Sequence, residues 1–221
     1  LQVNPRTKQF TYYHNEHDRL ALHNASVRSI TADKENNIWI GTAGGMNRLT
    51  SKRKMEFLDK RDSLPKTFIW KIFLDSRNVL WVGARDNIFY RDTLRQTFYS
   101  INSHPVLKAH ANKGARAIYE DRKRRLWFGG NGGGLLLYDP STNTVKHWMR
   151  KEGGDTTIIN NTINSIVEDG DGVIWCTSFT GLTSYNPGTG KFKWYTGRDG
   201  LPSIKLSGLK VDKRNNIWMG S

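Results

Sequence analysis

Seven side chains in this sequence combine ligand-binding chemistry with positions that recur along the chain. They are Arg28, Trp70, Arg85, Arg116, Asn131, Asn164 and Phe179. An arginine guanidinium forms paired hydrogen bonds with a carboxylate or sulfate, an asparagine amide both donates and accepts, and an aromatic ring presents a flat face to a sugar ring. The set therefore favours an oligosaccharide or another small anionic ligand, and an acidic oligosaccharide in particular.

Four of the seven occupy one column of a repeat, five residues before a recurring aspartate. This column varies from Trp70 to Ser207, whereas the packing positions of the same repeat are uniform, and a binding surface would vary in this way. The alternative is that side chains so varied simply face solvent. The other three, Arg85, Asn131 and Phe179, lie in corners between strands, where binding residues tend to occur.

Other reactive residues carry weaker signals. Cys176 is the only cysteine, so it can form no internal disulfide, and it takes a position that is apolar in the other copies, which predicts a buried thiol. The segment 169–172 resembles the start of a calcium loop, but Thr180 stands where the twelfth-position glutamate is needed. His14 and His17 lie in a polar loop without a further obvious ligand. We expect no metal and no cofactor.

The charge balance narrows the class of partner. Lysine and arginine number 34 against 20 aspartates and glutamates, a formal net charge of +14, which favours anionic partners. The basic clusters at 52–54 and 122–125 fall in expected turns rather than along one groove with stacked aromatic rings, which argues against nucleic acid. No stretch approaches the roughly 18 apolar residues of a membrane helix, so any membrane attachment would lie outside this chain.

One motif recurs five times and sets the spacing of these residues. Its tryptophan returns after 42, 46, 48 and 43 residues, within the range of roughly 40 to 50 typical of β-propeller blades. The five tryptophans are Trp39, Trp81, Trp127, Trp175 and Trp218. Each has an aspartate six residues before it: Asp33, Asp75, Asp121, Asp169 and Asp212. An isoleucine or leucine lies three residues before every aspartate and directly before every tryptophan.

The motif predicts a blade of four short antiparallel strands. In the copy at 26–58, an apolar strand leads into a turn that begins at Asp33, whose carboxylate can accept hydrogen bonds from backbone N–H groups two or three residues further on. A strand over 38–41, a glycine-rich corner and two further strands follow, the last reaching Phe57. Strand-forming runs bounded by Gly, Asn, Asp and Pro, without a helical period, favour an all-β radial array.

We expect a single β-propeller region over 1–221. Four complete repeats span 26–58, 68–99, 114–148 and 162–195, preceded by the outer part of a blade at 1–13 and followed by the inner part of a blade at 205–221. Either the two ends join to complete a fifth blade, or the chain is a piece of a larger propeller, which we favour. Because Leu1 is not an initiator methionine, we also expect the true N-terminus to lie elsewhere.

This pattern resembles the two-component regulator propeller repeat. The residues that carry the resemblance are Ile30-Thr-Ala-Asp33 with Ile38-Trp-Ile-Gly-Thr42, and Ile166-Val-Glu-Asp169 with Ile174-Trp175 and Gly181-Leu-Thr-Ser-Tyr185. The copy at 69–99 departs from the pattern, with Arg85-Asp-Asn87 in place of the glycine corner. The resemblance implies the periplasmic sensor region of a bacterial hybrid histidine kinase, in which propellers detect glycan fragments and drive phosphorelay across the inner membrane. The kinase, and any homodimer formed through the parent protein, would lie outside these residues.

Two other functions stay open. A streptogramin-lyase-like propeller has a related blade sequence and works by metal-assisted elimination, for which His23, His104 and His110 could be proposed as bases. No paired acid or base recurs with them, so we expect this chain to catalyse nothing. Alternatively, the blades form a scaffold that docks a protein partner or a second copy through exposed strand edges.

Overall fold

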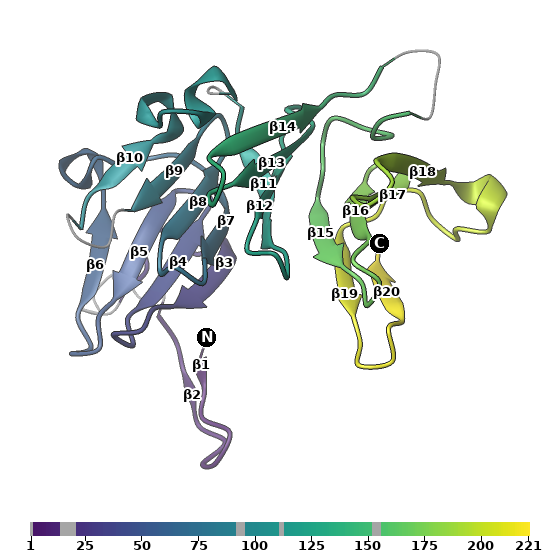
Figure 1. The fold of residues 1–221 in the computed structure, drawn as a ribbon. Coiled ribbons are helices and arrows are strands. Elements are labelled where there is room, and N and C mark those ends of the chain that lie inside the picture. Colours follow the sequence, from purple (N-terminus) through teal and green to yellow (C-terminus); the bar gives the residue numbers. More distant parts are fainter. Residues whose placement is uncertain (1, 14–20, 92–95, 111–112, 152–155) are drawn as a thin grey trace.

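The computed structural model describes residues 2–13, 21–91, 96–110, 113–151 and 156–221, and its regular structure is almost entirely β-strand. The described residues contain four short 3-10 helices: η1 (Lys60–Asp62), η2 (Ile101–Ser103), η3 (Leu107–His110) and η4 (Gly197–Asp199). The sheets follow one another around an arc in chain order (Figure 1). The predicted all-β propeller architecture is therefore confirmed, and His14 and His17 lie outside the described residues.

Four antiparallel sheets of four strands form the body of the arc. Blade 1 contains β3 (Val27–Ala32), β4 (Ile38–Thr42), β5 (Gly45–Leu49) and β6 (Met55–Leu58). Blade 2 contains β7 (Ile69–Leu74), β8 (Leu80–Ala84), β9 (Ile88–Arg91) and β10 (Phe98–Ser100). Blade 3 contains β11 (Ala115–Glu120), β12 (Leu126–Gly130), β13 (Leu135–Asp139) and β14 (Thr144–Trp148). Blade 4 contains β15 (Ser165–Glu168), β16 (Ile174–Ser178), β17 (Gly181–Asn186) and β18 (Lys191–Tyr195).

Two-stranded sheets flank these blades. The first pairs β1 (Gln2–Val3) with β2 (Phe10–Thr11), and the second pairs β19 (Gly208–Val211) with β20 (Ile217–Gly220). The two pairs are separate sheets, so the described residues do not form the closed fifth blade that the sequence left open (Figure 1). Blade packing also ends there, because Ile30 is 62% exposed and Trp218 is 64% exposed, whereas Trp127 is fully buried.

The motif aspartate hydrogen-bonds to the motif tryptophan in all five copies. In blade 3, Oδ2 of Asp121 accepts the indole N–H of Trp127 at 2.9 Å, while Oδ1 accepts the backbone N–H groups of Lys123 and Arg125. The other four bonds, from Trp39, Trp81, Trp175 and Trp218, measure between 2.7 and 3.0 Å. The turn contacts come from two and four residues further on, slightly beyond the predicted two or three. The six-residue spacing therefore lets one carboxylate close the turn and satisfy the buried indole.

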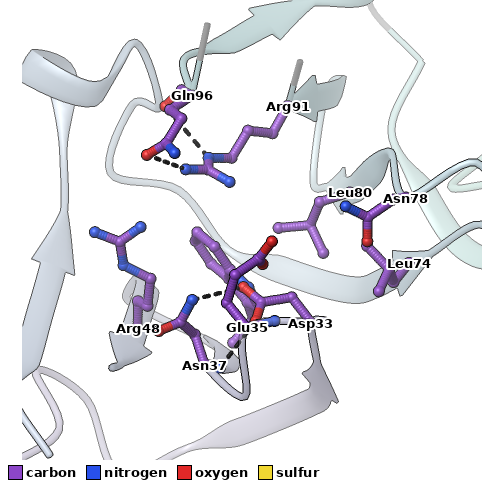
Figure 2. A pocket seen from close by; sticks show the side chains of 10 residues that line it. Asp33, Glu35, Asn37, Arg48, Leu74, Asn78, Leu80, Arg91 and Gln96 are labelled. Carbon is purple, nitrogen blue, oxygen red and sulfur yellow. Dashed lines mark hydrogen bonds between the residues drawn. The ribbon is translucent and has the colours of Figure 1, made fainter. Parts of the chain in front are cut away.

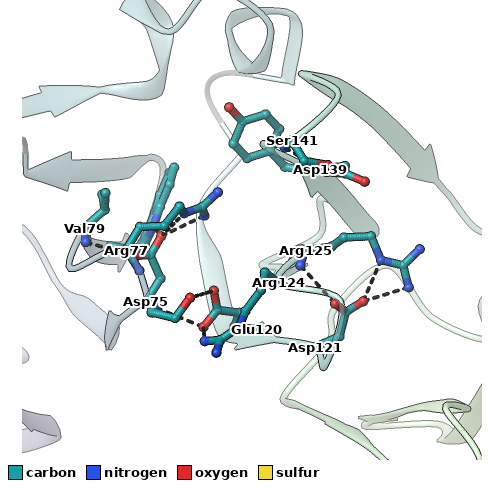
Figure 3. A network of polar contacts seen from close by, with 12 residues as sticks. Asp75, Arg77, Val79, Glu120, Asp121, Arg124, Arg125, Asp139 and Ser141 are labelled. Carbon is teal, nitrogen blue, oxygen red and sulfur yellow. Dashed lines mark hydrogen bonds and ion pairs between the residues drawn. The ribbon is translucent and has the colours of Figure 1, made fainter.

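The core lies in the seams between blades. Each of the three hydrophobic clusters takes residues from two consecutive blades; Trp39 of blade 1, for example, packs with Leu80 and Phe98 of blade 2. Polar contacts join the turns at the rim of the same seams, where the backbone N–H and hydroxyl of Ser76 donate to Glu120 at 2.9 and 2.7 Å (Figure 3). The Asp–Trp bond thus orients the one motif tryptophan that each of these three seams contains, which comes from the earlier of its two blades.

Glycines in the second strand allow neighbouring blades to approach closely. A Cβ atom at Gly83 would lie 2.2 Å from the carbonyl oxygen of Ala115 in the next blade, and one at Gly41 would lie 2.6 Å from Ile69. No real Cβ occupies such a distance, so these positions require glycine or a displaced blade. The fourth blade has Thr177 at the corresponding position, and that residue is fully buried.

Replacement of the buried aspartate should cost more stability than replacement of its exposed counterpart. Asp121→Ala leaves the Trp127 indole and the Arg125 guanidinium without their acceptor inside the seam, so we expect a loss of about 3 kcal/mol in the free energy of unfolding. Asp212→Ala removes the corresponding turn and indole contacts beside the exposed Trp218, together with the Asn216 amide contact in place of the arginine, and should cost clearly less. Denaturant unfolding measures both, and equal losses would contradict the role of burial.

The close approach at Gly83 gives a second test. Gly83→Ala forces the Ala115 backbone away and should lower the free energy of unfolding by roughly 2 kcal/mol, since overpacking a seam strains both blades. Gly197→Ala in η4 is the matched control, because a Cβ there meets nothing within 4 Å and should change stability by less than about 0.5 kcal/mol. Thermal and denaturant unfolding of the two variants would show whether the contact matters.

Candidate functional site

The first strand of each of blades 1 to 3 contains a β-bulge at the variable column of the repeat. Pairing shifts register between Val27 and Ser29, so Arg28 has no partner in the neighbouring strand. The same shift leaves Trp70 and Arg116 as the extra residues of β7 and β11. A bulge re-aims the side chain that it carries and disrupts the ladder locally. The fold therefore releases these three side chains from sheet packing.

These side chains form one continuous series of guanidinium–ring and ring–ring contacts with Phe68, Arg85 and Phe179. The Cζ atoms of Arg28 and Arg85 lie 5.2 and 5.6 Å from the ring centroid of Phe68. The rings of Phe68 and Trp70 are 4.2 Å apart, and the Cζ atom of Arg116 lies 4.2 Å from Trp70 and 5.0 Å from Phe179. We call these six residues (Arg28, Phe68, Trp70, Arg85, Arg116 and Phe179) the arginine–aromatic ladder. It spans four consecutive blades.

The ladder concentrates positive charge, and its arginines form no ion pair with any described carboxylate. Among the described residues, no carboxylate lies within 4.0 Å of the guanidinium groups of Arg28, Arg85 or Arg116. Burial, and then the charge of Arg28, lower the pKa of Arg116. Stacking on aromatic faces compensates part of this cost. An oxyanion held by these guanidinium groups would offset the remaining cost.

A groove of about 430 Å³ adjoins the ladder at Phe68 and Arg85. Its remaining walls are Ala43, Gly44, Lys66, Thr67 and Asp86. This volume is within the usual range for a small-molecule site, roughly 300 to 1,000 Å³. The Nε1 atom of Trp70 is buried and has no hydrogen-bond acceptor in the described part of the chain, which leaves a donor in the ladder unused.

The structure brings five of the seven candidate residues into the ladder. The other two, Asn131 and Asn164, have structural contacts instead. Asn131 donates from Nδ2 to the carbonyl oxygen of Arg85 at 3.4 Å, so it supports the corner that carries that arginine. Asn164 donates to the carbonyl oxygen of Leu206 at 2.8 Å, although its own Oδ1 is buried without a donor in the part of the chain that the structure describes.

Phe68 is the ladder residue that the sequence analysis missed. It lies seven residues before its motif aspartate, where the other copies have Ser26, Gly114, Thr162 and Lys205. A large aromatic residue in a column that is otherwise small or polar is the signal that could have identified Phe68.

The histidines proposed as alternative bases lie in different surroundings. His23 stacks on Phe57 with ring centroids 3.9 Å apart, and Nδ1 of His104 lies 3.3 Å from the Leu107 backbone N–H. His110 contacts His147 of blade 3. The three do not line a common cavity among the described residues, so the geometry gives no support to a shared catalytic base. Cys176 is buried as expected, and burial raises the pKa of its thiol.

A second, smaller pocket of about 100 Å³ lies at the turn end of the seam between blades 1 and 2 (Figure 2). Arg48 and Arg91 stack on Trp39 there, with Cζ atoms 5.2 and 5.0 Å from its ring. By strand pairing, Arg91 occupies the position of Tyr138 and Tyr185 in the next two blades, whose rings pack edge-on against the preceding tryptophan. The arginine leaves space that tyrosine fills elsewhere.

Comparison with known proteins identifies the repeat. Residues 21–44 and 157–180 match the two component regulator propeller family. No curated protein matches the chain significantly. No helix in the described residues is long and apolar enough to span a membrane.

Solved structures share the fold. The extracellular domain of BT4673 from B. thetaiotaomicron, named as a hybrid two component system, is 25% identical with a TM-score of 0.72; the match covers 89% of this chain and 26% of that domain. The corresponding domain of BT3049 is 22% identical with a TM-score of 0.76, covering 93% and 27%. Virginiamycin B lyase from Staphylococcus aureus is 12% identical with a TM-score of 0.63, covering 88% and 62%. This chain therefore spans about a quarter of the extracellular domains that it matches.

The crowding of like charges in the ladder predicts an unusual effect on stability. Arg116→Met keeps an apolar, polarizable side chain against Trp70 and removes one charge, so at low salt the free energy of unfolding should rise by roughly 0.5 kcal/mol. High salt should shrink the gain because it screens the repulsion. Denaturant unfolding at two salt concentrations checks this, with Arg198→Met in η4 as the control. A loss of stability at both concentrations would show that stacking outweighs repulsion.

Proposed function

We propose that this chain, which contains two-component regulator propeller repeats, forms part of the ligand-sensing region of an extracytoplasmic sensor protein. In this proposal the chain lies in the periplasm and signals to a histidine kinase outside these 221 residues. It binds and does not catalyse. The likeness to extracellular domains of hybrid two-component systems supports the location and the sensing role.

The ligand we infer is an oligosaccharide that carries carboxylate or sulfate groups. The observation behind this inference is the ladder, in which three guanidinium groups lie over aromatic rings and no described carboxylate lies within 4.0 Å of them. Guanidinium groups suit planar or tetrahedral oxyanions, and the rings suit the apolar faces of sugars. Neighbouring blades supply successive contacts, which suits a ligand longer than one sugar.

Ligand-induced stabilisation tests this proposal. A ligand that binds the folded chain raises its melting temperature, so acidic oligosaccharides should raise it and neutral ones of equal length should raise it less. The double variant Arg28→Met with Arg116→Met should weaken binding about tenfold or more, since each charge-assisted hydrogen bond contributes roughly 1.5 to 3 kcal/mol.

A charge-matched control separates the site from general attraction to a basic protein. Lys52→Met with Arg198→Met removes the same charge from exposed turns and should leave binding nearly unchanged. Equal weakening by both double variants would mean that net charge alone attracts the sugar. Binding of neutral and acidic sugars with equal affinity would refute the anionic ligand.

A further inference from the structure

Two histidines from different parts of the chain meet in the seam between blades 2 and 3. His110 ends η3, in the connection between these blades, and His147 lies on β14, the fourth strand of blade 3. Their Nδ1 atoms are 3.2 Å apart, and their rings are nearly perpendicular with centroids 4.8 Å apart. The pair belongs to neither the ladder nor the seam pocket at Arg91.

The surroundings of His147 fix which of its nitrogens has a free lone pair. Its Nε2 atom lies 2.7 Å from the carbonyl oxygen of Gly133, and a carbonyl oxygen can only accept, so Nε2 carries the proton. In the neutral ring Nδ1 is then unprotonated and faces His110. An N–H donated to a backbone carbonyl is the contact that orients histidine ligands in metal sites.

The spacing of the pair suits a shared ion. Two nitrogens 3.2 Å apart, each at the roughly 2.0 to 2.1 Å typical of zinc, subtend an angle of about 100° at the ion, near the tetrahedral value. A cavity of about 20 Å³ touches both rings, which is enough for one occupant of the size of water. His147 is exposed, so solvent can reach the site.

We propose that His110 and His147 bind one divalent transition-metal ion through their Nδ1 atoms, with water in the remaining positions. Imidazole favours Zn²⁺, Ni²⁺ and Cu²⁺, whereas Ca²⁺ and Mg²⁺ require oxygen ligands. Before binding, the Nδ1 proton of His110 points at His147. On binding, this proton leaves to solvent and the Nε2 atom of His110 takes up another, so the His110 ring remains neutral. Lys113 also lines the cavity, and its positive charge disfavours the binding of a cation there.

The ion would link the blade 2–3 connection to the last strand of blade 3. His147 also contacts Gly133, which belongs to the same corner as Asn131, and Asn131 donates to the carbonyl oxygen of Arg85. Metal binding should therefore stabilise the corner beside the arginine–aromatic ladder. This inference does not depend on the proposed ligand of the ladder.

Calorimetric titration of the metal-free chain, prepared without a histidine tag, tests the site. We expect one equivalent of Zn²⁺ to bind and to raise the melting temperature by a few degrees, while Ca²⁺ and Mg²⁺ do neither. His110→Gln should weaken Zn²⁺ binding about tenfold or more, and it leaves the contact between His147 and Gly133 in place. His147→Gln should have a comparable effect.

Three of the other four histidines provide the controls. His14→Gln with His17→Gln, and separately His23→Gln, should leave both the affinity and the stoichiometry unchanged. The unfolding transition of each variant without metal shows that it is folded. The proposal is wrong if the native chain binds no Zn²⁺, if both His110→Gln and His147→Gln keep full affinity, or if the His14 and His17 double variant is the one that loses it.

Discussion

The hydrogen bond from the motif tryptophan to the motif aspartate is the constraint on which this structure depends. An indole buries more apolar surface than any other side chain, but its N–H requires an acceptor once it leaves water. Asp121 supplies that acceptor to Trp127 with one oxygen and closes the preceding turn with the other. A single carboxylate thus fixes the turn, the pairing of the first two strands and the apolar face offered to the next blade.

Seams built in this way also position the arginine–aromatic ladder. The tryptophans and the close approaches at Gly41 and Gly83 hold the first strands of neighbouring blades side by side. Bulges in three of those strands then leave Arg28, Trp70 and Arg116 without a pairing partner in the neighbouring strand. The stacked arginines and aromatic rings are therefore a product of blade spacing, since no single blade contains more than three of them.

The sequence was sufficient for the architecture and for much of the ladder, because both follow from columns of the repeat. Strand ends such as Phe57 and Tyr195 fall within a residue of expectation, since local turns fix them. The contact between the rings of Phe68 and Trp70 could not be predicted from the sequence, because it depends on the bulge at Trp70. The pairing of His110 with His147 joins residues 37 apart through a connection that shows no repeat pattern.

The bulges also distinguish two kinds of strand position: those where a pairing partner restricts the side chain and those where it does not. A residue in register on β11 must suit its partner on β12, whereas Arg116 has no partner there and contacts Trp70 and Phe179 of the neighbouring blades. Substitution at such a position leaves the blade intact, so each copy can drift in chemistry while its neighbours hold the fold. Repeats of this kind can change the chemistry of this surface one blade at a time, while the strand pairing of each blade stays the same.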